Sequence, residues 1–137
     1  MKVINAEGKP LGRIASKTAE EAQKGKEIRI INSEKSIIVG KKQETIKKYK
    51  DKYSLRNLGN PRKSPKTISR RPDLFMKKTV EKMLPMEKQK GKKAKKRIKA
   101  YIENPEDLEE SENEIEEKTN KPHITIKDLC KELGQKN

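Results

Sequence analysis

The first forty residues, MKVINAEGKPLGRIASKTAEEAQKGKEIRIINSEKSIIVG, contain the pattern that decides the fold. Residues 2–4 read Lys-Val-Ile, a short strand signal, and residues 5–12 hold two glycines and a proline, which predicts a tight connection. Small apolar residues then recur at helical spacing over residues 11–22, and Gly25 is well placed to end that helix.

Two continuous apolar runs follow the predicted helix. Residues 28–31 are rich in isoleucine, and residues 37–39 read Ile-Ile-Val before Gly40. Continuous runs are typical of strands that are covered on both faces. A strand, a helix-length crossover and a second strand form a βαβ unit, so the sequence predicts an α/β fold whose core is a parallel sheet between helices.

The rest of the chain alternates helical patterns with loops. Helical patterns cover residues 41–49, residues 72–84 with a proline at the first position, and residues 88–99. Residues 53–71 contain prolines, asparagines and a glycine among several cations, which predicts a long basic loop. A last short helix is expected over residues 125–133, capped by its threonine and followed by a glycine.

The charge of the chain points to a polyanionic partner. Lys and Arg number 36 against 21 Asp and Glu, a formal net charge of +15 in 137 residues. Residues 41–100 carry 23 basic and 5 acidic side chains, whereas residues 101–137 carry 5 basic and 11 acidic ones. A nucleic acid would neutralise this middle section, and its binding would weaken steeply with salt. Aromatic residues make up only 3% of the chain, which favours contacts to the backbone over base stacking.

Two charge runs stand next to each other near the C-terminal end. Residues 88–99 hold eight cations and no acid, so a helix there would repel itself unless it touched anions. Nine of the fifteen residues 103–117 are acidic, which is typical of a solvated connector. We therefore interpret residues 88–99 as a nucleic-acid contact.

Several classes of site find no support in the residues. One cysteine and one histidine cannot complete a Cys/His zinc site or an internal disulfide, and no arrangement of nucleophile and base is evident. Residues 8–13, Gly-Lys-Pro-Leu-Gly-Arg, lack the spacing of a P-loop or of a dinucleotide fingerprint. At a helix N-terminus, this turn and Arg13 suit a single phosphate of a polynucleotide instead. We expect no enzymatic activity, no cofactor, no metal, no small-molecule substrate and no membrane span or secretory signal.

Several motifs occur in the order and spacing of a known family. They are residues 5–8 (Asn-Ala-Glu-Gly) with 11–15 (Leu-Gly-Arg-Ile-Ala), residues 31–35 (Ile-Asn-Ser-Glu-Lys) with 39–42 (Val-Gly-Lys-Lys), Val80 with 83–85 (Met-Leu-Pro), and residues 91–101 (Gly-Lys-Lys-Ala-Lys-Lys-Arg-Ile-Lys-Ala-Tyr). Over residues 1–105 the chain resembles the large-subunit ribosomal protein L13 family, and its closing segment, residues 123–126 with 133–134, resembles the archaeal branch.

The resemblance implies a three-layer α/β/α fold with a four-stranded parallel sheet, together with basic loops and a C-terminal extension. It also implies a structural component of the large ribosomal subunit in the cytoplasm, without catalytic activity, whose partners are large-subunit rRNA and neighbouring ribosomal proteins. We expect a domain over residues 1–105, followed by an acidic connector and a short helix over residues 106–137.

The candidate RNA contacts are basic residues from the first helix, the basic middle section and the cation run. They are Arg13, Lys41, Lys42, Lys47, Lys48, Arg56, Arg62, Lys63, Arg70, Arg71, Lys77, Lys78, Lys88, Lys90, Lys92, Lys93, Lys95, Lys96, Arg97 and Lys99. Two alternatives stay open at this point: a free-standing regulator that binds nucleic acid outside the ribosome, and a small nucleotide-binding enzyme that uses residues 8–13.

Overall fold

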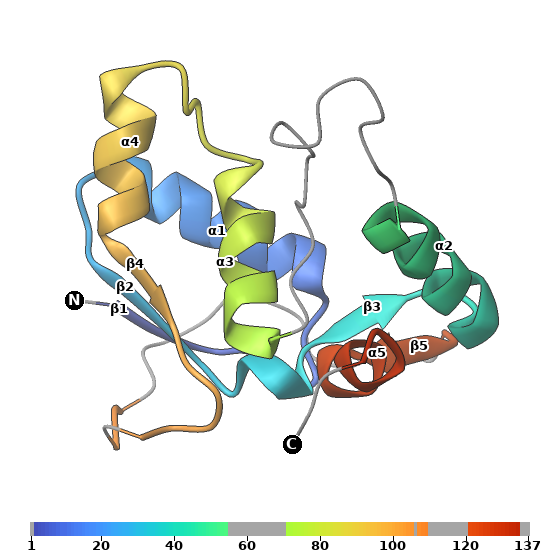
Figure 1. Cartoon of the computed structure of the whole chain (residues 1–137). Helices are drawn as coiled ribbons and strands as arrows, with labels where there is room; N and C mark the ends of the chain where they lie inside the picture. The colour runs from blue at the N-terminus through green and yellow to red at the C-terminus, as the bar shows by residue number, and fades with distance from the viewer. Residues whose placement is uncertain (1, 55–70, 106, 110–120, 135–137) are drawn as a thin grey trace.

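The chain folds into helices and short strands (Figure 1). The structure is a computed structural model that describes residues 2–54, 71–105, 107–109 and 121–134. In chain order its elements are β1 (Lys2–Asn5), α1 (Leu11–Gln23), β2 (Ile28–Ile31), the 3-10 turn η1 (Ser33–Lys35), β3 (Ile37–Val39), α2 (Lys42–Ser54), α3 (Pro72–Glu81), α4 (Gln89–Lys96), β4 (Ile98–Ala100), β5 (His123–Thr125) and α5 (Ile126–Glu132).

The strands form two small sheets. The first has three parallel strands in the order β1-β2-β4, with Ile28 opposite both Lys2 and Ile98. The second pairs β3 and β5 antiparallel, with Ile38 opposite Ile124. The mixed α/β fold and the βαβ unit of β1, α1 and β2 are therefore confirmed.

The four-stranded parallel sheet is wrong for the described residues, which contain three parallel strands. After β2 the chain turns at Asn32, whose φ of 55° is left-handed and whose side-chain amide donates to Asn5 Oδ1 at 3.0 Å. Residues 33–35 then form η1, which separates the central strand β2 from β3. Ile37 makes an isolated parallel bridge to Pro10, and β3 pairs with β5 instead. The three-layer arrangement stays a prediction.

One apolar cluster holds the helices and the three-stranded sheet together. The predicted stripe of α1 is buried throughout: Leu11, Ile14, Ala15, Thr18, Ala19 and Ala22. Side chains from α1, α3 and α4 share this cluster with Ile4, Ile30 and Ile98, so these three helices pack on the same face of the sheet. Residues of β5 and α5 join it as well. No helix in the described part of the chain is long and apolar enough to cross a membrane.

The helix ends differ from the sequence prediction at three places. The helix expected over residues 88–99 stops at Lys96, and Ile98 belongs to β4. The helix that starts at Pro72 ends at Glu81, three residues before Leu84. Tyr53 and Ser54 continue α2, and the remainder of the predicted basic loop, residues 55–70, lies outside the described residues.

The C-terminal helix agrees with the sequence prediction. Thr125 Oγ1 accepts a hydrogen bond from the backbone N–H of Asp128 at 3.2 Å, which confirms the predicted N-cap of α5. The predicted division of the chain between residues 105 and 106 stays a prediction.

Candidate nucleic-acid interface

Helix α4 is the most cationic element of the described structure. It is eight residues long and contains no acidic residue, and Lys93, Lys95 and Lys96 lie in its last turn. The helix packs through Gly91 and Ala94, both buried. A Cβ at Gly91 would overlap the backbone carbonyl of Pro85, so only glycine allows α4 to lie this close to the preceding turn. The small residues Gly91 and Ala94 thus allow α4 to pack closely, and lysines occupy the other faces of the helix.

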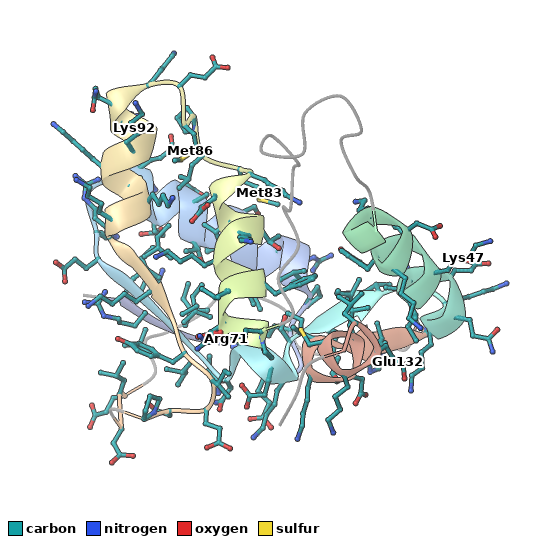
Figure 2. All side chains as sticks on the ribbon, viewed as in Figure 1. Lys47, Arg71, Met83, Met86, Lys92 and Glu132 are labelled. Carbon is teal, nitrogen blue, oxygen red and sulfur yellow. The ribbon has the colours of Figure 1, made fainter. Side chains whose placement is uncertain are left out.

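The cations of α4 fall on three faces because of the helical period. Lys92 and Lys96 are exposed, and the helical period places them away from the buried Gly91 and Ala94. Figure 2 labels Lys92 on α4. Lys95 leans towards α3, where its Nζ lies 3.5 Å from Glu81 Oε1.

The third face of α4 turns towards the end of α1. Lys90, Lys93 and Arg97 line a hollow there together with Gln23 and Lys24. Arg97 is fixed in place, since its guanidinium donates to the carbonyl oxygen of Ala22 at 2.9 Å. Within the described residues, the side-chain ammonium groups of Lys90, Lys92, Lys93 and Lys96 make neither a hydrogen bond nor an ion pair, so their charges are available to an anion.

Helix α2 carries a second group of cations at the other end of the molecule from α4, with α3 between them (Figure 1). Lys48 and Lys52 lie with their ammonium groups 6.0 and 5.5 Å from the centre of the Tyr49 ring. Burial lowers the pKa of Lys52, and repulsion from Lys48 and Lys82 adds to this effect. Lysines that repel each other across α2 and the end of α3 favour a polyanionic partner.

Three lysines of β1, α1 and the segment after α1 form ion pairs with a buried carboxylate. The carboxylate of Glu21, whose side chain is 6% exposed, lies 2.8 Å from Lys26, 3.6 Å from Lys17 and 3.9 Å from Lys2. The hydrogen bond from Lys26 is the main reason that the pKa of Glu21 falls to about 2, and it outweighs the opposing effect of burial. These three lysines share the Glu21 carboxylate within the fold, so we do not add them to the interface.

The turn at residues 8–13 has the predicted place between β1 and the N-terminus of α1. Gly8 adopts φ 70°, and Pro10 precedes the helix without a side-chain cap. Arg13 is exposed at the first turn of α1, while Lys9 is buried, at 3% exposure. The phosphate contact of this turn stays a prediction.

The predicted contact residues fall into three groups according to their exposure. Exposed are Arg13, Lys41, Lys42, Lys47, Lys48, Arg71, Lys88, Lys90, Lys92, Lys93, Lys96 and Lys99. Half-buried are Lys77, Lys78, Lys95 and Arg97. Outside the described residues are Arg56, Arg62, Lys63 and Arg70. Arg71 and Lys95 are paired with Asp73 and Glu81, respectively.

Sequence reasoning missed Lys24 and Met83, which lie beside α4. Lys24 follows the end of α1, and Met83 follows the end of α3, with 43% of its surface exposed. Met83 falls within the helical pattern predicted over residues 72–84, which gave no reason to expect it at the interface. Neither residue has a local signal, because their proximity to α4 depends on how three helices pack.

The single cysteine and the single histidine do not lie in a common site. Cys130 is buried, and burial together with Asp73 raises the pKa of its thiol to about 12. His123 is exposed on β5, with Nδ1 at 3.1 Å from the carbonyl oxygen of Lys121. No group of three metal-ligating side chains occurs among the residues that the structure describes.

Comparison with known proteins adds the decisive observation. The family model described as Ribosomal protein L13 matches residues 1–107. The chain belongs to the ribosomal protein L13 family. This is a structural family without enzymatic activity, which confirms the prediction that the chain is not an enzyme and removes the nucleotide-dependent alternative.

Curated L13 relatives match almost the whole chain. "Large ribosomal subunit protein uL13" of Methanocaldococcus jannaschii is 41% identical over 99% of both chains. The protein of the same name from Methanopyrus kandleri is 38% identical over 96% of this chain and 86% of its own. That from Saccharolobus solfataricus is 33% identical over 96% and 91%. Archaeal relatives of this kind confirm the predicted branch of the L13 family.

Proposed function

We propose that this L13 chain is a structural constituent of the large ribosomal subunit that binds and helps to fold large-subunit rRNA. The observation that carries the proposal is the surface of α4. This helix contains no acidic residue, and four of its lysines have side chains without a partner among the described residues. Family membership supports the ribosomal role, since the curated relatives are large-subunit proteins by name.

The contacts are made chiefly to phosphates. Folded RNA presents its phosphates and 2′-hydroxyl groups across a shallow groove, whereas its bases are poorly accessible in helical regions. Lysines such as Lys92 and Lys96 suit phosphate groups because each is a mobile point charge. The partners are therefore large-subunit rRNA and adjoining ribosomal proteins, in the ribosomes of the cytoplasm.

The binding surface extends beyond α4. Lys41, Lys42, Lys47 and Lys48 are exposed on or next to α2, which lies at the far end of the molecule. Two cationic groups at opposite ends would allow the chain to hold two RNA segments at a fixed distance. A structural, assembly-supporting role follows from this arrangement.

A salt titration tests the proposal. Filter binding of transcribed archaeal large-subunit rRNA is measured between 50 and 200 mM salt for the wild type and for Lys92→Gln/Lys96→Gln. Each lost phosphate contact lowers the slope of log K against log salt by about 0.7 to 0.9, so we expect a reduction of about 1.5. The control is Lys127→Gln/Lys131→Gln, which removes the same charge from the exposed side of α5.

Two results would contradict the proposal. One is a wild-type protein that is indifferent to this rRNA at moderate salt. The other is a double variant of α4 with the same slope as the α5 control. Sedimentation of the chain away from the large subunit at low salt would favour the free-standing regulator.

A further inference from the structure

A groove runs between the end of α1 and the inner face of α4. Its first part has a volume of about 410 Å³ and is lined by Ser16, Ala19, Glu20, Gln23, Lys24, Met83 and Lys90. An adjoining part of about 340 Å³ is lined by Gln23, Lys24, Gly25, Lys90, Lys93 and Arg97. Three residues are common to both parts, so they form one open groove.

The groove is built from two helix faces. The α1 residues occupy positions i, i+3, i+4, i+7 and i+8, which form one continuous stripe on that helix. Lys90, Lys93 and Arg97 occupy positions i, i+3 and i+7 on the facing side of α4. Both faces belong to packed helices, so the shape of the groove is set by the fold.

One end of the groove is cationic. Lys90, Lys93 and Arg97 face Lys24 there. Glu20, 3.1 Å from the Lys24 ammonium, neutralises that lysine but leaves the three cations of α4. An anion at this end would meet Arg97 already positioned by its bond to Ala22.

The other end of the groove offers apolar surface. Met83 lies just beyond α3, where its backbone N–H donates to the carbonyl oxygen of Val80 at 3.0 Å, and Figure 2 shows it at the end of α3 that leads to α4. Its side chain is 43% exposed beside Ala19. A thioether is polarisable and suits the flat face of an aromatic ring. Aromatic side chains, the usual partners of unstacked bases, make up only 3% of this chain.

We propose that this groove holds one unstacked nucleotide of the large-subunit rRNA. Its flanking phosphates lie at Lys90, Lys93 and Arg97, and its base lies over Met83. The inference rests on the proposed function and deepens it, because it adds a specific contact to an otherwise electrostatic surface. RNA fits better than an acidic peptide, since Lys92 and Lys96 are exposed on another face of the same helix and would meet the phosphates of a longer polyanion.

Two pairs of variants test the groove in filter binding to transcribed archaeal large-subunit rRNA. Met83→Ala is compared with Leu74→Ala, which removes a side chain of similar exposure, 39%, from the same region of chain. Met83→Ala should weaken binding about tenfold at every salt concentration without a change in slope, because an apolar contact releases no counterion. Leu74→Ala should bind within about twofold of the wild type. Lys90→Gln/Lys93→Gln should lower the slope by about 1.5, unlike Lys127→Gln/Lys131→Gln.

A second readout locates the nucleotide. Acylation of 2′-hydroxyl groups reports unstacked nucleotides, so one nucleotide that the wild-type protein protects should become reactive again with Met83→Ala and stay protected with Leu74→Ala. Thermal unfolding checks that each variant is folded. Met83 and Leu74 are both exposed, so neither change should alter the fold.

The outcomes separate the two proposals. If the wild type does not bind the rRNA, the proposed function fails. If the wild type binds with the expected slope but Met83→Ala behaves like Leu74→Ala in both readouts, the groove inference alone is overturned. It is also overturned if Met83→Ala keeps full RNA affinity but loses binding to a purified large-subunit protein, since the groove would then hold a protein.

Discussion

Replacement of Gly91 by alanine tests how α4 is held against the body of the protein. In most helices this change stabilises by about 1 kcal/mol, because alanine has the higher helix propensity. Here the added methyl group would overlap the carbonyl of Pro85 and touch the amide of Met86. These are backbone atoms that cannot rotate away, so the turn or α4 must shift.

The expected change in the free energy of unfolding follows from two opposing effects, overpacking and helix propensity. Overpacking of a close contact costs about 1 to 3 kcal/mol, and the backbone overlap places Gly91→Ala at the upper end. After the gain in propensity, we expect a net loss of about 2 kcal/mol in the free energy of unfolding. The midpoint of thermal unfolding should fall by roughly 3 to 5 °C for each kcal/mol.

Gly12 provides the matched control. It lies in α1, and a Cβ there would have no atom within 4 Å. Gly12→Ala should therefore stabilise by about 0.5 kcal/mol. Urea unfolding of the three proteins gives the answer, and a Gly91→Ala variant as stable as Gly12→Ala would refute the packing of α4 described above.

Three further predictions concern other parts of the fold. The folded-state pKa of Glu21, about 2, lies below its ordinary 4.5, so its stabilising effect is complete above about pH 4.5 and disappears as the pH falls towards 2. In urea unfolding at pH 7, Glu21→Gln should therefore be less stable than the wild type. If the difference in stability between the two proteins fails to narrow by pH 3, the ion cluster around Glu21 is not the cause. Thr125→Ala should lose about 1 kcal/mol of stability because it removes the cap from the Asp128 N–H, while Thr125→Ser should stay close to the wild type, and equal losses in the two variants would exclude the cap. Asn32→Val should lose about 2 kcal/mol of stability in calorimetry, because a branched residue disfavours the φ of 55°. Asn32→Gly should lose about 1 kcal/mol, the contribution of the hydrogen bond from Asn32 to Asn5. A valine variant as stable as the glycine variant would contradict the left-handed turn.

The sequence predicted the elements whose signals are local. The apolar stripe from Leu11 to Ala22 has a clear helical period, and every member is buried as expected. The start of α3 at Pro72 and the cap of α5 at Thr125 follow from single residues with strong positional preferences. Such features depend on neighbours a few positions away, which is why they can be read from one sequence.

Pairing between distant strands could not be predicted in the same way. Ile98 is an isolated apolar residue in a cation run, and it becomes a strand residue only because Ile28 lies beside it in β2. The run at β3 resembles a parallel strand by composition, yet β5, more than eighty residues later in the chain, pairs with it antiparallel. The prediction of a fourth parallel strand was therefore wrong for the part of the chain that the structure describes.

The candidate site likewise has features that the sequence predicted and features that it could not predict. The charge of residues 88–99 was evident from composition, and Lys90, Lys92, Lys93 and Lys96 of α4 are exposed as a contact surface requires. Which of them face α1 was not evident, because the groove exists only once Gly91 and Ala94 have seated α4 on the core. Lys24 and Met83 enter the site through that packing alone.

Lysine acetylation in purified large subunits tests the central claim most directly. Acetylation rates are compared, residue by residue, between the free protein and the chain within the particle. Lys92 and Lys96 of α4 and Lys47 of α2 should be protected in the particle, and protection should be lost when high salt releases the chain. If Lys92 and Lys96 react as fast in the particle as in the free protein, the cationic face of α4 is not the surface that binds RNA.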